Sequence, residues 1–199
     1  MFAIFIGFLG GLVTALIIER LKKPKLRLSA GPISDQVHGD IPIRFLYVRV
    51  ENELLTAPII SWFISRTPAL RARATIEFLR LDGSSVFARP MTARWSFSIL
   101  PPRLAEENVL HLADLAALDL RDIFCGESED LDVAMKQGDR NEAFGFNNMS
   151  YVNGFTAPDW LLPPDRYIIL VTVAAGDVRV CKKFVLRADW PRSDFSLEV

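Results

Sequence analysis

The stretch "ALRARATIEFLRLDG" (69–83) carries the clearest secondary-structure pattern in the sequence. Apolar and polar residues alternate along it, and a period of two is typical of a strand with one buried face. The apolar positions on one face are Ala72, Ala74, Ile76 and Phe78. The opposite face carries Arg71, Arg73, Thr75 and Glu77. Asp82-Gly83 then predicts a hairpin turn into "SSVFARPM".

Other segments on both sides of this strand also read as strands. They are 25–30, 43–52, 130–136, 166–174 and 178–187. Of these, "RYIILVTVA" (166–174) is apolar on both faces, as a central strand should be. In "DLDVAMK" (130–136), alternation places Leu131, Val133 and Met135 inward. Helical periodicity after Pro24 is weak, and "RLAEENVLHLADLAAL" (103–118) is the exception. About seven short strands joined by Pro, Gly and Asp turns predict an all-β fold, an antiparallel β-sandwich.

One tyrosine narrows this prediction. In "LPPDRYIILVTV", Tyr167 enters a long central strand just after a turn, as the tyrosine corner does in immunoglobulin-like sandwiches. Tyrosine is also common in ordinary strands, so the position alone does not decide. The chain resembles a loose group of uncharacterised prokaryotic proteins with one N-terminal span and an immunoglobulin-like cytoplasmic domain. The segments that carry the resemblance are "YVRVEN", "RTPALRARATIEFL", "ARWS", "GESEDLDVA" and "DRYIILVTV". The resemblance implies a fold and brings no activity.

The N-terminus differs from the rest of the chain. Phe2 to Ile18 is an uncharged, mostly aliphatic run. As a helix it spans about 25 Å, near the lower limit for a hydrocarbon core of about 30 Å. The basic residues that follow it directly are Arg20, Lys22, Lys23, Lys25 and Arg27. A cleaved signal peptide carries its positive charge before the apolar run, so a retained transmembrane helix is favoured.

The basic flank also predicts the orientation, because basic flanks stay cytoplasmic. We therefore expect a single-pass protein of the cell inner membrane, with its N-terminus outside and its domain in the cytoplasm. Three parts are expected: a transmembrane helix with its flank (1–23), a sandwich (24–190) with an insertion at about 103–122, and a C-terminal tail (191–199). Cys125 and Cys181 lie in no CxxC arrangement, and free thiols suit a reducing compartment.

Small residues recur at every fourth position of the apolar run. They are Ala3, Gly7, Gly11 and Ala15. Positions four apart share one helical face, so they form a shallow groove that lets two helices approach closely in lipid. Glycine and alanine are also common in membrane helices generally. The spacing favours packing against another transmembrane helix, and both a second copy and a foreign partner remain open.

The loop "LLTAPIISWFIS" (54–65) is unusually apolar. Its large residues are Ile59, Ile60, Trp62, Phe63 and Ile64. If the first strand leaves the membrane and the second returns, this loop lies at the membrane-proximal end. Its aromatic residues then meet lipid headgroups or a neighbouring subunit, and Arg66 pairs with lipid phosphates. The alternative is an extra strand with its aromatic residues in the core.

A second surface follows from the central strand. If Tyr167 points inward, Ile168 and Leu170 point outward. The basic residues expected beside them on the flanking strands are Arg71, Arg73, Arg179, Lys183 and Arg187. An apolar strip bordered by basic residues is a candidate docking face. The alternative is that the 103–122 insertion covers the strip.

The sequence shows little sign of catalysis. His38 and His111 have no metal-ligand spacing around them, and no Walker A loop, GxSxG or GxGxxG is present. "GESEDLD" (126–132) gathers four carboxylates without EF-hand spacing, so a solvated acidic turn is expected. The near-neutral charge, with 23 basic and 24 acidic residues, argues against a nucleic-acid binder. We expect no enzyme, no cofactor and no metal site.

Two classes of function remain. The first is a non-enzymatic accessory or structural subunit of a larger membrane complex, docked through its helix and its sandwich. The second is a self-standing, membrane-tethered adaptor or sensor that binds a soluble protein or ligand. The sequence favours the first, and it names no complex.

Overall fold

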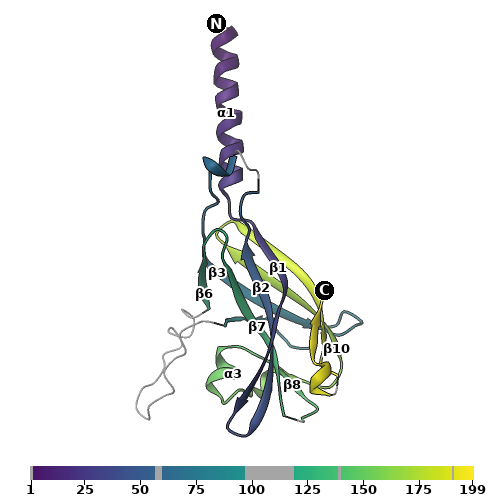
Figure 1. Cartoon of the computed structure of the whole chain (residues 1–199). Coiled ribbons are helices and arrows are strands. Elements are labelled where there is room, and N and C mark those ends of the chain that lie inside the picture. Colours follow the sequence, from purple (N-terminus) through teal and green to yellow (C-terminus); the bar gives the residue numbers. More distant parts are fainter. Residues whose placement is uncertain (1, 57–59, 97–118, 139, 190) are drawn as a thin grey trace, which may run out of the picture.

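The computed structural model describes residues 2–56, 60–96, 119–138, 140–189 and 191–199, without the side chains of residues 2–9, 60 and 152. Two antiparallel sheets form a sandwich, and helix α1 (Phe2–Lys22) projects from one end of it (Figure 1). The predicted all-β sandwich is therefore confirmed. Ile59, His111 and the expected insertion up to residue 118 lie outside the described residues.

The first sheet, sheet A, is centred on two long strands. Its strand order is β1 (Leu26–His38), β2 (Ile41–Asn52), β7 (Ser128–Gln137), β8 (Ala143–Gly145) and β9 (Leu161–Leu162), with β5 (Arg94–Trp95) also paired to β7. The β1–β2 register shifts between Ala30 and Ile33. A Cβ on Gly31 would lie 2.8 Å from the Cβ of Tyr47, so the strands approach too closely there for any residue but glycine.

The second sheet, sheet B, contains the strand that opened the sequence analysis. Its order is β12 (Ser196–Glu198), β11 (Val178–Arg187), β10 (Arg166–Ala175), β3 (Ala69–Leu79) and β4 (Met91–Thr92), with β6 (Leu120–Ile123) also paired to β3. The predicted central position of β10, between β3 and β11, is confirmed. Residues 191–199, expected as a tail, add β12 to this sheet and bury Phe195.

In the described ranges of the chain, four short helical segments connect the strands. They are η1 (Ile60–Trp62), α3 (Asn148–Val152), η2 (Pro158–Trp160) and η3 (Arg192–Asp194). The side chain of Asn147 caps α3 by accepting a hydrogen bond from the Ser150 amide at 2.9 Å. Asparagine is among the preferred residues at this position because its short side chain reaches the free amides of the first turn.

The core lies between the two sheets and follows the predicted alternation. On β3, all four predicted inward residues are buried, from Ala72 to Phe78. On β10, Ile169, Val171 and Val173 are fully buried and Tyr167 nearly so. Burying one branched side chain of this size stabilises a fold by about 1.5–3 kcal/mol, so the strands are held by the face that the alternation predicts.

Strand β7 departs from simple alternation. The β2–β7 register shifts between Leu46 and Tyr47, which is the mark of a bulge. Leu131, Val133 and Ala134 belong to the main core, whereas Met135 belongs to a second cluster of buried residues. The prediction that Met135 points inward with Leu131 and Val133 is wrong, because the extra residue of the bulge reverses the faces after it.

The predicted tyrosine corner has the expected hydrogen bond. The Tyr167 hydroxyl donates to the carbonyl of Pro163 at 2.7 Å, across the turn that leads into β10. Burial raises the pKa of Tyr167 to about 12, so the hydroxyl keeps its proton and donates. This bond fixes the path of the chain into the central strand of sheet B.

Helix α1 stands clear of the sandwich (Figure 1). Its described side chains include exposed Leu12, Val13, Leu16 and Ile17. Within the described part of the chain, no helix reaches the length and apolar character that crossing a membrane requires.

Candidate functional site at the base of the N-terminal helix

The base of α1 is joined to the sandwich through one buried asparagine. Asn52, at the end of β2, has no exposed surface. Its Oδ1 accepts from the Lys25 amide at 3.1 Å, and its Nδ2 donates to the carbonyls of Thr67 (3.1 Å) and Ile123 (3.2 Å). One side chain therefore ties the segment after the helix to the loop before β3 and to β6.

The last turn of α1 is bonded by the same loop. The Thr67 amide and hydroxyl both donate to the carbonyl of Lys22, at 2.6 and 2.9 Å. A guanidinium nitrogen of Arg66 donates to the carbonyl of Lys23 at 3.2 Å. These carbonyls have no partner within the helix, and a cation is favourable at that end of the helix dipole. One guanidinium nitrogen of Arg66 is thus engaged at the helix end, and the expected pairing of Arg66 with lipid phosphates stays a prediction.

The apolar loop lies beside this helix end, as its predicted topology requires. Segment η1 sits next to the last turns of α1 (Figure 1). Trp62 and Phe63 are 87% and 83% exposed, and Ile64 is half-buried. The alternative of a core strand is therefore wrong for these two aromatic residues. The side chain of Ile60 is outside the described part.

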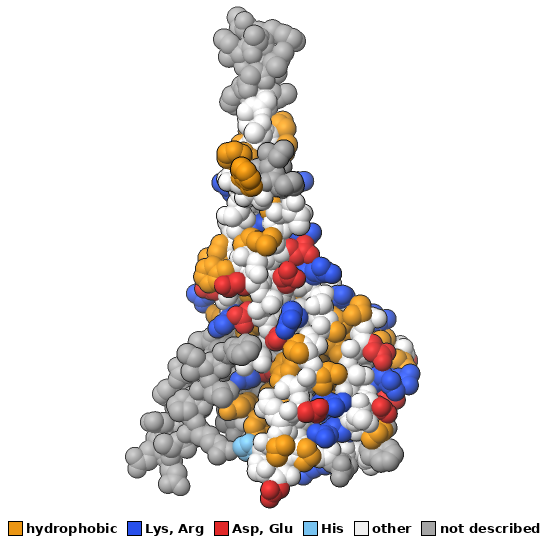
Figure 2. All heavy atoms as spheres, in the orientation of Figure 1, with side chains coloured by type: hydrophobic (Ala, Val, Ile, Leu, Met, Phe, Trp, Pro, Cys, Tyr) orange, Lys and Arg blue, Asp and Glu red, His pale blue; other side chains and the backbone are white. Residues whose placement is uncertain are grey.

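The basic flank surrounds the same region. Arg20, Lys22, Lys23, Lys25 and Arg27 are all exposed. Lys23 pairs with Asp177 in the β10–β11 turn, and Lys25 lies 2.7 Å from a Glu53 oxygen. The hydrogen bond from Lys25 holds the pKa of Glu53 below its usual range. Exposed pairs of this kind contribute little to stability. Hydrophobic and basic side chains stand together where α1 meets the sandwich (Figure 2).

The small-residue groove is described only in its second half. Gly11 and Ala15 are exposed, and a Cβ added at Gly11 would meet nothing within 4 Å. The side chains of Ala3 and Gly7 fall outside the described ones. In the isolated chain, the described end of the groove is therefore uncovered, and a helix of another chain could pack there.

The outer face of sheet B brings most of the predicted docking residues together. Ile168 and Leu170 are half-buried. Leu170 stands opposite Lys183 on β11, and Ala174 stands between Arg73 and Arg179. Arg187 lies opposite Arg166 on the same face.

Arg71 departs from the predicted face. It has a φ of 51° within a register shift, its backbone amide donates to Asp122 at 2.6 Å, and it lines a surface hollow together with β6.

Sequence reasoning missed a buried ion pair on sheet A. Arg94 on β5 pairs with Asp132 on β7, and their side chains are 5% and 3% exposed. The Arg94 guanidinium lies 4.9 Å from the centre of the Tyr151 ring. Burial raises the pKa of Asp132 to about 6, against the opposing effect of Arg94.

The solvated acidic turn expected over 126–132 is corrected in the same region. Glu129, Asp130 and Asp132 lie on β7 and pair with Arg121, Arg49 and Arg94. The signal that marks the pairs of Asp130 and Asp132 is register, because Arg49 and Arg94 stand directly opposite them on neighbouring strands. The pair of Arg121 and Glu129 instead joins β6 of sheet B to β7 of sheet A.

The other chemical groups named from the sequence stand apart. His38 is exposed at the end of β1 and packs its ring against Phe155, with 5.0 Å between centres. Cys125 and Cys181 are free thiols. Among the described residues, no group of three or more His, Cys, Asp or Glu is placed to hold a metal ion.

Comparison with known proteins adds no relative. No protein-family model, no curated protein and no solved structure matches this chain.

Proposed function

We propose that this protein is a non-enzymatic, membrane-anchored accessory subunit of a larger membrane complex. Its helix and the base of its sandwich make the contacts. The observation that carries the proposal is the exposure of Trp62 and Phe63 beside the end of an apolar helix. Large aromatic side chains that are exposed close together mark interaction sites, and such side chains are found both at lipid headgroups and in protein interfaces.

The anchor itself is supported by the sequence and by the position of α1. The run from Phe2 to Ile18 contains no charge, and α1 has no sandwich strand packed against its projecting part (Figure 1). The basic flank lies on the sandwich side of this run, which favours an N-terminus outside and a cytoplasmic domain. The hydrogen bonds from Asn52, Arg66 and Thr67 would hold the sandwich at a fixed angle to such an anchor.

An immunoglobulin-like topology is the finer form of the sandwich that we propose. In that fold, strands A, B, E and D form one sheet and C, F and G the other. Here β1, β2, β7 and β5 neighbour one another in sheet A, and β3, β10 and β11 do so in sheet B. Tyr167 bonds back to Pro163 at the start of the strand equivalent to F. Domains of this kind commonly serve as binding modules, which supports a docking role.

The proposal is tested by extracting the full chain in mild detergent, separating by size and identifying co-migrating proteins. Co-migration with a large complex at fixed stoichiometry supports the subunit. A lone monomer or dimer contradicts it and favours the self-standing adaptor. In the same preparation, Gly11→Leu should weaken the association by filling the groove, whereas Val13→Leu, on the opposite helix face, should not.

The contact made by Trp62 is tested separately by fluorescence in vesicles containing brominated lipid. With Trp190 replaced by Phe in both proteins, quenching should exceed that of the Trp62→Phe variant, because Trp95 and Trp160 are buried in the sandwich. Equal quenching in both proteins would remove lipid contact from the proposal. A change in Trp62 emission only when the complex is dissociated would place the loop against a neighbouring subunit.

A further inference from the structure

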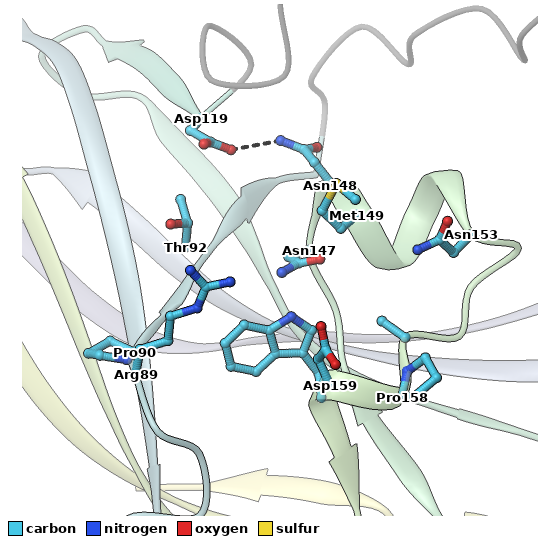
Figure 3. A pocket seen from close by; sticks show the side chains of 12 residues that line it. Arg89, Pro90, Thr92, Asp119, Asn147, Asn148, Met149, Asn153, Pro158 and Asp159 are labelled. Atoms are coloured by element: carbon cyan, nitrogen blue, oxygen red, sulfur yellow. Dashed lines mark hydrogen bonds between the residues drawn. The ribbon is translucent and has the colours of Figure 1, made fainter. Parts of the chain in front are cut away.

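A polar cavity lies at the end of the sandwich away from α1. It has a volume of about 470 Å³, opens to solvent on one side, and is lined by residues of β4, α3 and η2 and their flanking loops. The side chains on which the inference depends are Arg89, Asp119, Asn147, Asn148, Asp159 and Trp160. Figure 3 shows Arg89, Asp119, Asn147, Asn148 and Asp159 around the cavity, on separate segments of the chain. A volume of this size falls in the range of small-ligand sites.

Two buried asparagines form the inner wall. Asn147 and Asn148 are only 8% and 7% exposed. Asn147 uses its Oδ1 to accept from the amide and hydroxyl of Ser150, at 2.9 and 3.1 Å. No hydrogen bond from its Nδ2 is found among the described residues, and this nitrogen faces the cavity (Figure 3). The Nδ2 is therefore placed to donate to a ligand in the cavity.

The upper wall supplies acceptors. Asn148 Nδ2 donates to Asp119 Oδ1 at 2.7 Å, which holds the carboxylate in place. The second oxygen of Asp119 and the Oδ1 of Asn148 have no partner within the described part of the chain. The backbone carbonyl of Asp119 is fixed as well, because it accepts from the Trp95 indole at 3.1 Å. The site is therefore built on buried, bonded residues.

The rim and floor complete the lining. Arg89 and Asp159 are exposed, and Arg89 extends its guanidinium toward Asn147 (Figure 3). Trp160 is buried and held edge-on by Phe87, with ring centres 4.9 Å apart. An indole held in this way offers a rigid surface for the apolar part of a ligand.

We propose that this cavity binds a small, neutral, polyhydroxylated ligand, a sugar of one or two rings. A hydroxyl group both donates and accepts, so it matches donors and acceptors placed side by side. Asn147 Nδ2 and Arg89 are the donors, and Asp119 and Asp159 are the acceptors. Two carboxylates against one guanidinium disfavour an anion such as phosphate. The inference goes beyond the proposed function and does not depend on it.

The test is calorimetric titration of the full chain in a detergent without a sugar headgroup. The probes are glucose, N-acetylglucosamine, myo-inositol, maltose and trehalose, with inorganic phosphate, glycine and putrescine as competing classes. At least one sugar or inositol should bind with a millimolar or lower Kd. Failure of all five, or binding only of phosphate, glycine or putrescine, overturns the proposal.

The matched variant is Asn147→Asp. Aspartate keeps an oxygen that can cap α3, so the fold should persist, and it replaces the Nδ2 donor with a negatively charged carboxylate oxygen. Binding should weaken by about tenfold or more, the effect of losing one good hydrogen bond, whereas Asn141→Asp, outside the cavity, should bind as the parent does. Asp159→Ala at the exposed rim is the second variant and should also weaken binding. Unchanged affinity in both cavity variants overturns the site.

Discussion

The two outer faces of the sandwich begin from the same alternation and end differently. On sheet A, the outward residues Phe45, Tyr47 and Met135 are buried again beneath Tyr151 and Phe155. On sheet B, the outward residues Ile168 and Leu170 stay half-exposed beside Lys183. The difference comes from the connection: the segment from α3 to Phe155 returns across sheet A and closes a second cluster there.

This contrast shows that an apolar residue on the outer face of a sandwich can be either buried or exposed. Alternation predicts only which residues point away from the main core. It does not state whether a later loop covers them, and that depends on contacts far apart in sequence. Covered and open faces should then differ sharply in their response to substitution.

The largest loss of stability on substitution is expected at the buried ion pair on sheet A. Arg94→Met leaves Asp132 buried without its cation, and removing one partner of such a pair costs about 3–5 kcal/mol. Urea unfolding of the sandwich measures this. The double variant Arg94→Met/Asp132→Leu should recover most of the loss, because an apolar pair needs no compensation. A double variant as unstable as the single one would mean that the pair is needed for packing rather than for charge.

The aromatic cluster gives the next effect. Phe146 is buried and its ring centre lies 5.1 Å from that of Phe45, so Phe146→Ala should destabilise by about 3 kcal/mol. Near-ultraviolet circular dichroism and unfolding curves report this. The matched change on the open face, Ile168→Ala, should cost clearly less because its side chain is only half-buried. Equal losses would show that both faces are covered.

A smaller effect concerns pH. The pKa of Asp132 rises from 3.8 to about 6 on folding, so the folded state holds the proton more tightly. The contribution of this group to stability is therefore fully present below pH 3.8 and falls as the pH rises through about 6. The free energy of unfolding is measured at several pH values for the parent protein and for Asp132→Asn. The difference between the two should decrease as the pH rises.

Asp35 provides the control of opposite sign. The hydrogen bond from Arg44 holds the pKa of Asp35 below its usual value, so its contribution is present above that value and lost as the pH falls. Asp35→Asn should therefore remove a slope that rises with pH. If both variants shift the profile in the same direction, the assignment of Asp132 is wrong.

The parts of the fold that could be predicted are those with one uniformly buried face. Strands β10 and β11, and β3 from Ala72 onward, follow the period of two, and the register of the sheet follows from it. The loop containing Trp62 could be placed too, because antiparallel strands return to the end from which they began.

The rest could not be predicted for identifiable reasons. The bulge in β7 adds one residue without a compositional signal and turns Met135 to the other face. Strands β5, β8 and β9 have two or three residues each, too short for any periodicity. The cavity at Asn147 joins segments far apart in sequence, so only the folded chain brings its polar groups together.

The smallest effect on stability is expected at Leu170, on the outer face of sheet B. Leu170→Thr keeps a good strand former at a half-exposed position, so the free energy of unfolding should change by no more than about 0.5 kcal/mol. If the face of Leu170 and Lys183 docks onto a partner, the same variant should lose co-migration with the membrane complex, because the apolar contact is lost there. Val37→Thr, which also places a threonine at an exposed strand position on β1, should leave both properties unaltered. A loss of more than about 1 kcal/mol at Leu170 would instead mean that the chain itself covers this face, since only buried positions respond so strongly to losing apolar side-chain atoms. The outer face of sheet B would then resemble that of sheet A, and the docking partner would have to be sought at the base of α1.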